Sequence, residues 1–132
     1  MASGGVPCLL SMPQTAIVIY QESEGDVPLV DWLASLPEKV QAKCDAKMGR
    51  LAELGYELRR PEADYLRDGI YELRIGHRGA NYRILYTFVG HQIVLLTHGI
   101  VKESRVPLKE IDEAIVRKTK WESDPKTYTY KE

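Results

Sequence analysis

Residues 70–98 read IYELRIGHRGANYRILYTFVGHQIVLLTH, and this segment predicts three consecutive strands. Apolar and polar side chains alternate along residues 70–75 and again along 81–89, which is the pattern of half-buried strands. Residues 92–98 are apolar on both faces, as expected of a central strand. Short glycine-containing turns separate the three segments, so we expect the strands to pair in antiparallel fashion.

The chain before this segment predicts one strand and two helices. Residues 16–20 are rich in β-branched side chains and form the expected first strand. A helix is expected over residues 28–36, because Asp26 precedes it and Pro28 suits its first turn. A second helix is expected over residues 37–55, with an apolar stripe of Val40, Cys44, Met48 and Leu51.

The remaining segments complete the predicted fold. Asp68-Gly69 is a turn signal just before the first of the three strands, and Pro107 begins a helix with apolar residues at helical spacing. We therefore expect an α+β protein with a small, mostly antiparallel sheet. An N-terminal helical hairpin and a C-terminal helix pack on it, on one face. The expected organisation is a flexible extension (1–15), a single domain (16–121) and a polar C-terminal tail that frays (122–132).

Length and composition are those of one folded domain. The chain has 132 residues, of which 44% are hydrophobic and 28% charged. Its longest apolar runs are far shorter than the roughly 18 residues that a membrane helix needs, and no signal-peptide pattern is visible. Cys8 and Cys44 are expected to be free thiols in a reducing cytoplasm. We therefore expect a cytoplasmic protein without a membrane partner.

Charge is unevenly distributed although the net charge is only −1. Residues 1–66 hold six Lys/Arg against ten Asp/Glu, whereas residues 67–120 hold ten against six. No acidic residue lies between Leu73 and Lys102. This window contains four basic residues and all three histidines: Arg74, Arg78, Arg83, Lys102, His77, His91 and His98. The pattern indicates a polyanionic ligand or an acidic partner, or else an uneven solvated surface.

Two arginines in the predicted sheet are the first candidates for a ligand site. Arg74 and Arg83 lie on neighbouring strands, out of phase with the aromatic residues, so both should face the same open side of the sheet. Guanidinium groups there could hold a phosphate, with Lys102 at the rim. Alternatively, Glu72 could pair with Arg74 in an exposed ion pair of little value. Arg83 lies in an otherwise apolar strand and needs a partner or a ligand.

Other chemistry receives less support from the sequence. Tyr71, Tyr82 and Tyr86 offer rings for base stacking or hydroxyls for proton transfer, but the alternation of Tyr82 and Tyr86 with apolar residues favours core packing. The histidines are 14 and 7 residues apart and lack metal-ligand spacing, so no zinc site is expected. The Gly76-x-x-Gly79 segment predicts a plain hairpin turn rather than a phosphate-binding loop.

Several motifs together resemble the RelE/ParE superfamily of bacterial type II toxins, and most closely its HigB-like, phage-derived branch. They are LRDGIYELR (66–74), YRILY (82–86), LLTHGIVK (95–102) and a Pro-x-x-x-Ile-x-x-Ala helix that begins at Pro107. The resemblance covers about residues 17–121, and the helical hairpin matches only in pattern.

This resemblance implies a small toxin that a cognate antitoxin neutralises, often through a protein with a helix-turn-helix domain. Many members cleave mRNA on the ribosome without a metal or cofactor, by attack of the ribose 2′-OH on the adjacent phosphate. Carried over, Arg74 and Arg83 would hold the scissile phosphate, and Lys102 would add charge or act on the nucleophile. His98 is a candidate general acid or base. The expected RNA-binding residues are Arg67, Tyr71 and Arg78.

Two alternatives remain open. The protein could be a ParE-like toxin that inhibits DNA gyrase by protein–protein contact, or a degenerate toxin homologue that only binds its antitoxin. The family loop usually carries two adjacent lysines, whereas Val101 precedes Lys102 and Glu103 follows it here. This departure counts against full nuclease activity.

Overall fold

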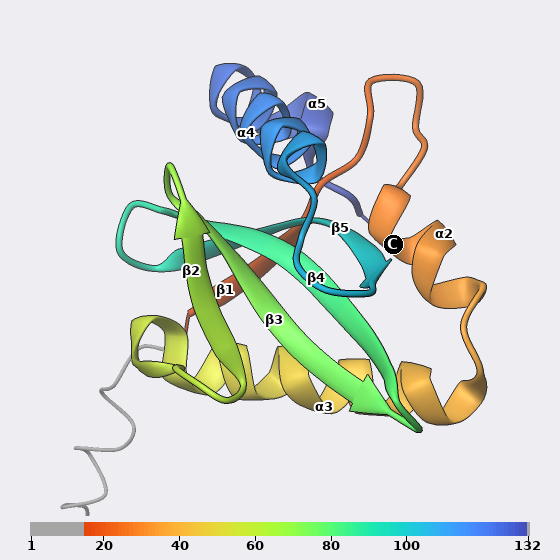
Figure 1. Ribbon diagram of the computed structural model, residues 1–132. Coiled ribbons are helices and arrows are strands. Elements are labelled where there is room, and N and C mark those ends of the chain that lie inside the picture. The colour runs from red at the N-terminus through yellow and green to blue at the C-terminus, as the bar shows by residue number, and fades with distance from the viewer. Residues whose placement is uncertain (1–14, 132) are drawn as a thin grey trace, which may run out of the picture.

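The computed structural model describes residues 15–131 (Figure 1), so the expected N-terminal extension lies outside the described residues except for Thr15. The first two predicted helices begin and end within two residues of those observed, and the third begins within one residue of the predicted start. The elements in chain order are β1 (Ala16–Ile19), α2 (Pro28–Ala34), α3 (Glu38–Leu54), the 3₁₀ helix η1 (Gly55–Glu57), β2 (Ala63–Arg67), β3 (Ile70–His77), β4 (Ala80–Val89), β5 (Ile93–Lys102), α4 (Leu108–Ser123) and α5 (Pro125–Tyr128).

Five strands form one sheet in the order β1-β5-β4-β3-β2. The pairs β2–β3, β3–β4 and β4–β5 are antiparallel, and β1 alone runs parallel to its neighbour, β5. The expected α+β class with a mostly antiparallel sheet is therefore confirmed. None of the helices within residues 15–131 is long and apolar enough to cross a membrane.

Two tight turns join β2 to β3 and β3 to β4. Asp68 and Gly69 have φ angles of 51° and 82°, and Arg78 and Gly79 have φ angles of 50° and 83°. Two consecutive residues with positive φ angles form a tight turn whose twist matches that of the two strands it joins. Glycine, the second residue of each turn, adopts a positive φ angle without strain. Our sequence interpretation recognised Asp68-Gly69 as a turn but missed β2, the strand that must precede such a hairpin.

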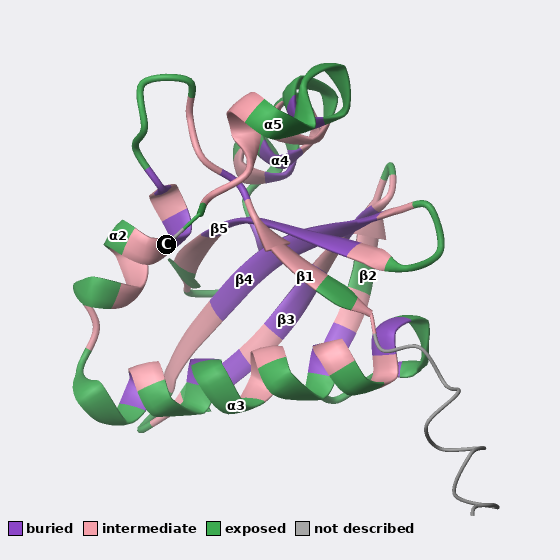
Figure 2. Cartoon of the chain, turned by 180° about the vertical axis from the view of Figure 1, so that it is seen from behind, coloured by how far each residue is buried: buried purple, intermediate pink, exposed green. Residues whose placement is uncertain are grey.

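The helices cover both faces of the sheet, so the expectation of helices on one face is wrong. On one face α3 buries Val40, Cys44 and Leu51 against the residues of β3, β4 and β5 that point the same way. On the other face α4 buries Ile111 and Ala114. The central strands β4 and β5 are apolar on both sides, and each side therefore requires a cover. Figure 2 shows buried residues along these strands and exposed residues on the outer side of α3.

Residues 124–131 pack against the domain, in contrast to the fraying tail that we expected. After α4 ends at Ser123, the short helix α5 places the ring of Tyr128 against that of Tyr20, with ring centroids 5.8 Å apart. The backbone N–H of Tyr130 donates to Ile19 O at 2.8 Å. Aromatic contact and backbone pairing with β1 therefore hold a segment whose composition alone is polar.

Helix α2 approaches the sheet closely where β5 has a glycine. Trp32 packs against Gly99, and a Cβ atom at position 99 would overlap the indole ring. The same ring meets Tyr82 edge-on, with centroids 6.2 Å apart. The sequence did not reveal whether Trp32 is buried; the structure places it half-buried between α2 and β5.

We expect Gly99→Ala to lower the free energy of unfolding by about 1–3 kcal/mol, because the methyl group forces Trp32 and α2 away from the sheet. Urea unfolding followed by tryptophan fluorescence measures this loss. Gly76→Ala is the matched control, since nothing lies within 4 Å of a Cβ at that position. Equal midpoints for the two variants would contradict the contact.

Candidate anion-binding site

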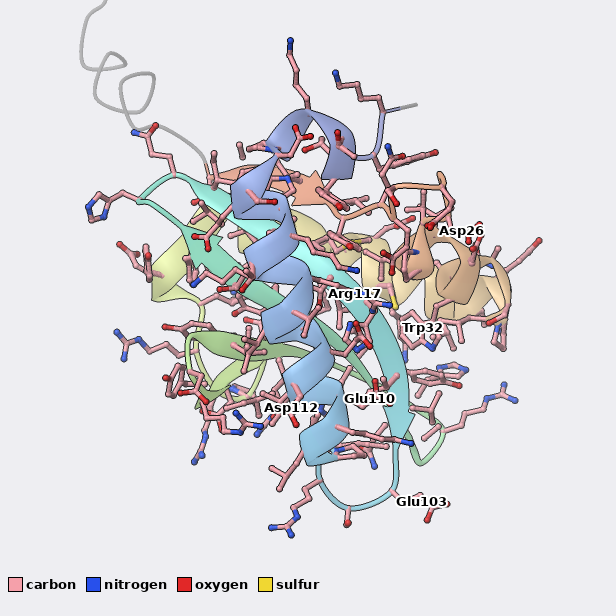
Figure 3. The ribbon with its side chains drawn as sticks, turned by 90° about the horizontal axis from the view of Figure 1, so that it is seen from above. Asp26, Trp32, Glu103, Glu110, Asp112 and Arg117 are labelled. Atoms are coloured by element: carbon pink, nitrogen blue, oxygen red, sulfur yellow. The ribbon has the colours of Figure 1, made fainter. Side chains whose placement is uncertain are left out.

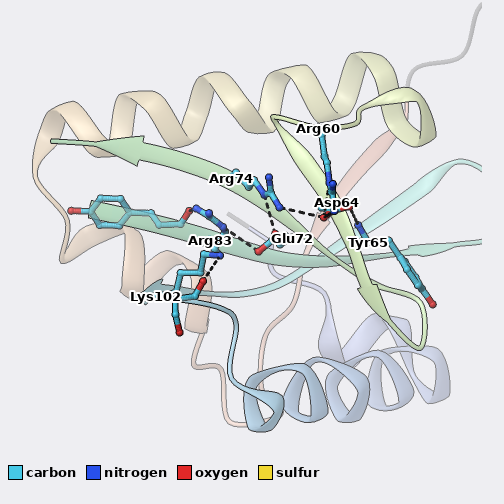
Figure 4. A network of polar contacts seen from close by, with 9 residues as sticks. Arg60, Asp64, Tyr65, Glu72, Arg74, Arg83 and Lys102 are labelled. Atoms are coloured by element: carbon cyan, nitrogen blue, oxygen red, sulfur yellow. Dashed lines mark hydrogen bonds and ion pairs between the residues drawn. The ribbon is translucent and has the colours of Figure 1, made fainter. Parts of the chain in front are cut away.

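Five side chains of β2, β3, β4 and the preceding loop form a continuous network of alternating charge (Figure 4). Arg60 Nη2 lies 2.8 Å from Asp64 Oδ2, and Arg74 Nη2 donates to the same oxygen at 3.2 Å. Arg74 Nε donates to Glu72 Oε2 at 2.9 Å, and Arg83 Nε donates to Glu72 Oε1 at 3.1 Å. We call this set (Arg60, Asp64, Glu72, Arg74 and Arg83) the arginine network.

The strand register creates this network. Arg74 and Arg83 are direct partners in the β3–β4 ladder, and Asp64 and Glu72 are direct partners in the β2–β3 ladder. Like charges opposite one another repel, and each carboxylate here relieves that repulsion by lying between guanidinium groups. The prediction that Arg74 and Arg83 share one side of the sheet is confirmed.

Burial of Glu72 differs from what the sequence suggested. Only 3% of Glu72 and 7% of Arg83 are exposed, so the alternative of a weak, exposed pair between Glu72 and Arg74 is wrong. Desolvation lowers the pKa of Arg83, which Glu72 partly offsets, and the guanidinium stays charged because its ordinary pKa is so high. Glu72 engages both arginines through Nε and so orients the remaining N–H groups of each fork.

A pocket of about 530 Å³ opens beside these arginines at the edge of β3. Its charged lining consists of four cationic side chains and one carboxylate: Lys43, Lys47, Arg74, Arg83 and Glu62. Glu62 accepts from Arg50 and from Lys47, and these bonds lower its pKa to about 2. The negative charge of Glu62 is thus already balanced by its two cationic partners. The pocket therefore presents an excess of positive charge to a bound anion.

Lys102 lies near the arginine network at the end of β5. Its Nζ donates to Ser104 O at 3.2 Å. Burial lowers the pKa of Lys102, and the nearby charge of Arg83 lowers it further. The structure therefore brings together three of the four residues that we predicted to be catalytic, namely Arg74, Arg83 and Lys102.

The fourth predicted catalytic residue, His98, lies apart from this group beneath α4. Its Nε2 lies 3.1 Å from Glu110 Oε1, and its Nδ1 lies 3.0 Å from Thr97 Oγ1. Figure 3 shows Glu110 and Arg117 on the same side of α4, above β5. Burial and the charge of Arg117 lower the pKa of His98. His98 is therefore a buried, neutral residue at pH 7 that joins α4 to the sheet.

This burial predicts a pH dependence of stability. The folded-state pKa of His98 lies below its ordinary value of about 6.5, so the unfolded chain binds more protons in this range. Stability should therefore fall as the pH drops through about 6.5. His98→Gln keeps a hydrogen-bonding side chain without the titration, and its urea midpoint should vary less between pH 7 and pH 5. Parallel pH profiles of the two proteins would contradict this assignment.

The three predicted RNA-binding residues lie at separate places. Arg67 bridges Asp68 and Asp112 at the end of β2. Tyr71 points to the α3 face, with its ring 5.3 Å from that of Tyr86. Arg78 occupies the exposed turn between β3 and β4. The structure thus joins none of them to the arginine network.

Core packing of the strand tyrosines is confirmed. Tyr86 is fully buried and Tyr82 is partly buried against the same cluster. Cys44 is a buried free thiol on the inner face of α3, and burial raises its pKa to about 11. Cys8 lies outside the described residues. Within residues 15–131, no group of three or more His, Cys, Asp or Glu side chains could hold a metal ion.

Several residues of the site escaped sequence reasoning. The Asp68-Gly69 turn could have revealed the strand that carries Asp64, although a regular hairpin would place Tyr65 opposite Glu72 and only the register shift between Tyr65 and Arg67 brings Asp64 there. Lys43 and Lys47 carry no such signal, because they reach the pocket only through the packing of α3 against the sheet.

The fold and the site together define a small α+β protein with a cationic pocket beside paired strand arginines. Comparison with protein families identifies it more closely: the family described as “Phage derived protein Gp49-like (DUF891)” matches residues 31–119, which is more than half of the chain. The chain belongs to this phage-derived family, which is of the RelE toxin type. A search of curated proteins gives no significant match.

Proposed function

We propose that the protein is the toxin of a type II toxin–antitoxin module, of the HigB-like branch, and that it cleaves mRNA on the ribosome. Membership of a phage-derived toxin-like family supports the first part. The second part rests on one observation, the pair Arg74 and Arg83, which Glu72 orients at the rim of a cationic pocket. Such a pair suits the non-bridging oxygens of a phosphodiester.

The proposed reaction is transesterification within the RNA. The ribose 2′-hydroxyl releases its proton to solvent as its oxygen attacks the adjacent phosphorus. The bond to the 5′-oxygen breaks, and a 2′,3′-cyclic phosphate and a 5′-hydroxyl result. Arg74 and Arg83 stabilise the charge that develops on the phosphate. Lys102 is the titratable group beside them whose pKa is lowered, and we assign it to protonate the leaving 5′-oxygen. His98 remains a candidate for proton transfer, although Glu110 engages its Nε2.

The proposed partners are the ribosome, its mRNA and a cognate antitoxin, which the family resemblance expects to be a helix-turn-helix protein. An antitoxin segment that covers the arginine network would mask the phosphate-binding groups. Two exposed apolar side chains, Val101 near the end of β5 and Leu108 at the start of α4, flank the loop after β5 and could contact such a segment.

The ParE-like alternative also has an observation in its favour. Arg74 and Arg83 already share Glu72, and Arg74 also pairs with Asp64, so a purely structural network would look the same. Inhibition of gyrase by surface contact requires no free guanidinium N–H, whereas cleavage of RNA does.

Primer extension on a reporter mRNA after brief induction in bacteria separates these functions. We expect discrete cuts that appear only while the message is translated. Growth arrest with intact mRNA would instead favour the gyrase inhibitor. Normal growth with intact mRNA and soluble protein would favour a homologue that only binds its antitoxin.

A further inference from the structure

We infer that a second pocket, at the outer edge of the sheet, binds a nucleobase of single-stranded RNA; this inference rests on the proposed function. The pocket has a volume of about 460 Å³ and lies between η1, the loop that follows it, β2 and β3. Its lining includes three tyrosines, two arginines and one carboxylate: Tyr56, Tyr65, Tyr71, Arg59, Arg60 and Asp64. We call it the tyrosine pocket.

The rings of the tyrosine pocket are exposed and held in place. Tyr56 and Tyr65 are 49% and 52% exposed, and they are two of the five large hydrophobic residues that are exposed within residues 15–131. The Tyr56 ring stacks on Phe88 with centroids 3.7 Å apart. The Tyr65 hydroxyl accepts from the N–H of Gly69 at 3.1 Å. Rigid aromatic surfaces of this kind stack on nucleobases at little cost in entropy.

The charges of the pocket suit the rest of a nucleotide. Arg60 is held by Asp64, whereas no carboxylate within residues 15–131 pairs with Arg59. An unpaired guanidinium beside aromatic rings can contact the phosphate that flanks a stacked base. Tyrosine rings with a guanidinium in reach favour a single-stranded nucleic acid over an uncharged aromatic ligand.

One residue connects the tyrosine pocket with the arginine network. Asp64 lines the pocket, and its Oδ2 accepts from Arg74 at 3.2 Å. Figure 4 shows Tyr65 beside Asp64, on the side away from Arg83. The paired residues Tyr65 and Tyr71 lie on the α3 side of the sheet, whereas the adjacent pair of Asp64 and Glu72 lies on the other side. An RNA strand with a phosphate at Arg74 and Arg83 would therefore pass over the edge strand β2 to place a base in the tyrosine pocket. Because the stacked base anchors the strand, the pocket sets the position of the scissile bond.

Binding of a short single-stranded RNA to the purified protein tests the inference, with a matched RNA in which each base in turn is replaced by an abasic ribose. We expect Tyr65→Ala to weaken binding of the intact RNA about tenfold or more, and Tyr65→Phe to retain most of the affinity. One of the abasic RNAs should lack the base that enters the pocket. The wild type should bind this RNA as weakly as Tyr65→Ala binds the intact RNA. The affinity of Tyr65→Ala for the same abasic RNA should be little lower than its affinity for the intact RNA.

The outcomes separate this inference from the proposed function. In one outcome the wild type cleaves translated mRNA, and Tyr65→Ala binds RNA and cleaves at the same positions. The tyrosine pocket is then not a base-binding site, and the nuclease proposal stands. If Tyr65→Ala loses binding to the antitoxin while its RNA affinity is unchanged, the pocket holds a protein segment and the inference is wrong. If the wild type neither binds nor cleaves RNA, both fail. Urea unfolding of Tyr65→Ala confirms that the variant is folded.

Discussion

Arg83→Ala is expected to abolish growth arrest and to reduce mRNA cleavage by about 100- to 1,000-fold, the loss typical when one donor to a developing anionic charge is removed. Arg83 is the more buried of the two arginines, and its fork is fixed by Glu72 and by a bond from Nη1 to Tyr82 O of 2.9 Å. A preorganised donor of this kind acts without reorganisation during the reaction. Growth curves and primer extension on the same cultures measure both effects.

Two variants separate this chemical role from a structural one. Arg83→Lys keeps the positive charge beside Glu72 but loses the planar guanidinium that can donate two parallel hydrogen bonds to a phosphate. We therefore expect a folded protein whose mRNA cleavage remains strongly impaired. Lys126→Ala removes one positive charge from the exposed surface of α5 and should leave growth arrest unchanged. Undiminished growth arrest by a well-expressed Arg83→Ala protein would exclude a phosphate-binding role for this residue.

Glu72→Gln is expected to lower the free energy of unfolding by about 3 kcal/mol, because it leaves two opposed guanidinium groups without their shared, buried counterion. Arg74 and Arg83 are direct partners on β3 and β4, so their positive charges repel one another when Glu72 no longer carries a negative charge. The glutamine has the same shape, and the loss therefore reports charge rather than packing. Urea unfolding at pH 7 measures it.

An exposed carboxylate supplies the control. Glu113 lies 3.6 Å from Arg117 and its side chain is 46% exposed, so Glu113→Gln should change stability by less than about 1 kcal/mol. Adding Arg83→Gln to Glu72→Gln should restore part of the lost stability, since it removes the uncompensated buried charge. A Glu72→Gln protein as stable as the wild type would show that Glu72 is not the counterion that organises the site.

Much of the fold could be predicted from local patterns. Alternation in β3 and β4, the stripe of α3 and the proline at the start of α2 each reflect a local preference of the chain. β2 was missed because Ala63–Arg67 mixes small, charged and aromatic residues and gains its strand conformation from pairing with β3. The face that α4 covers and the order of the C-terminal segment depend on distant contacts, such as that of Tyr128 with Tyr20.

The candidate site was predictable only in part. Strand periodicity placed Arg74 and Arg83 on one side of the sheet, and the structure confirms that placement. The periodicity carries no information about how deeply Glu72 is buried, because that depends on what packs over the strand. Lys43 joins the site from a helix far away in the sequence. Arginine pairs on adjacent strands are thus readable from sequence, whereas their counterions and the pocket around them are not.

The central claim is that the arginine network promotes attack of a ribose 2′-OH on the adjacent phosphate. The most direct test uses purified ribosomes programmed with a message that carries a single 2′-deoxynucleotide immediately 5′ of the cleaved bond. We expect the all-ribose message to be cut to a 2′,3′-cyclic phosphate, the deoxy message to stay intact at that bond, and Arg83→Ala to cut neither. Equal cleavage of both messages, or cleavage by Arg83→Ala at the wild-type rate, would contradict the account.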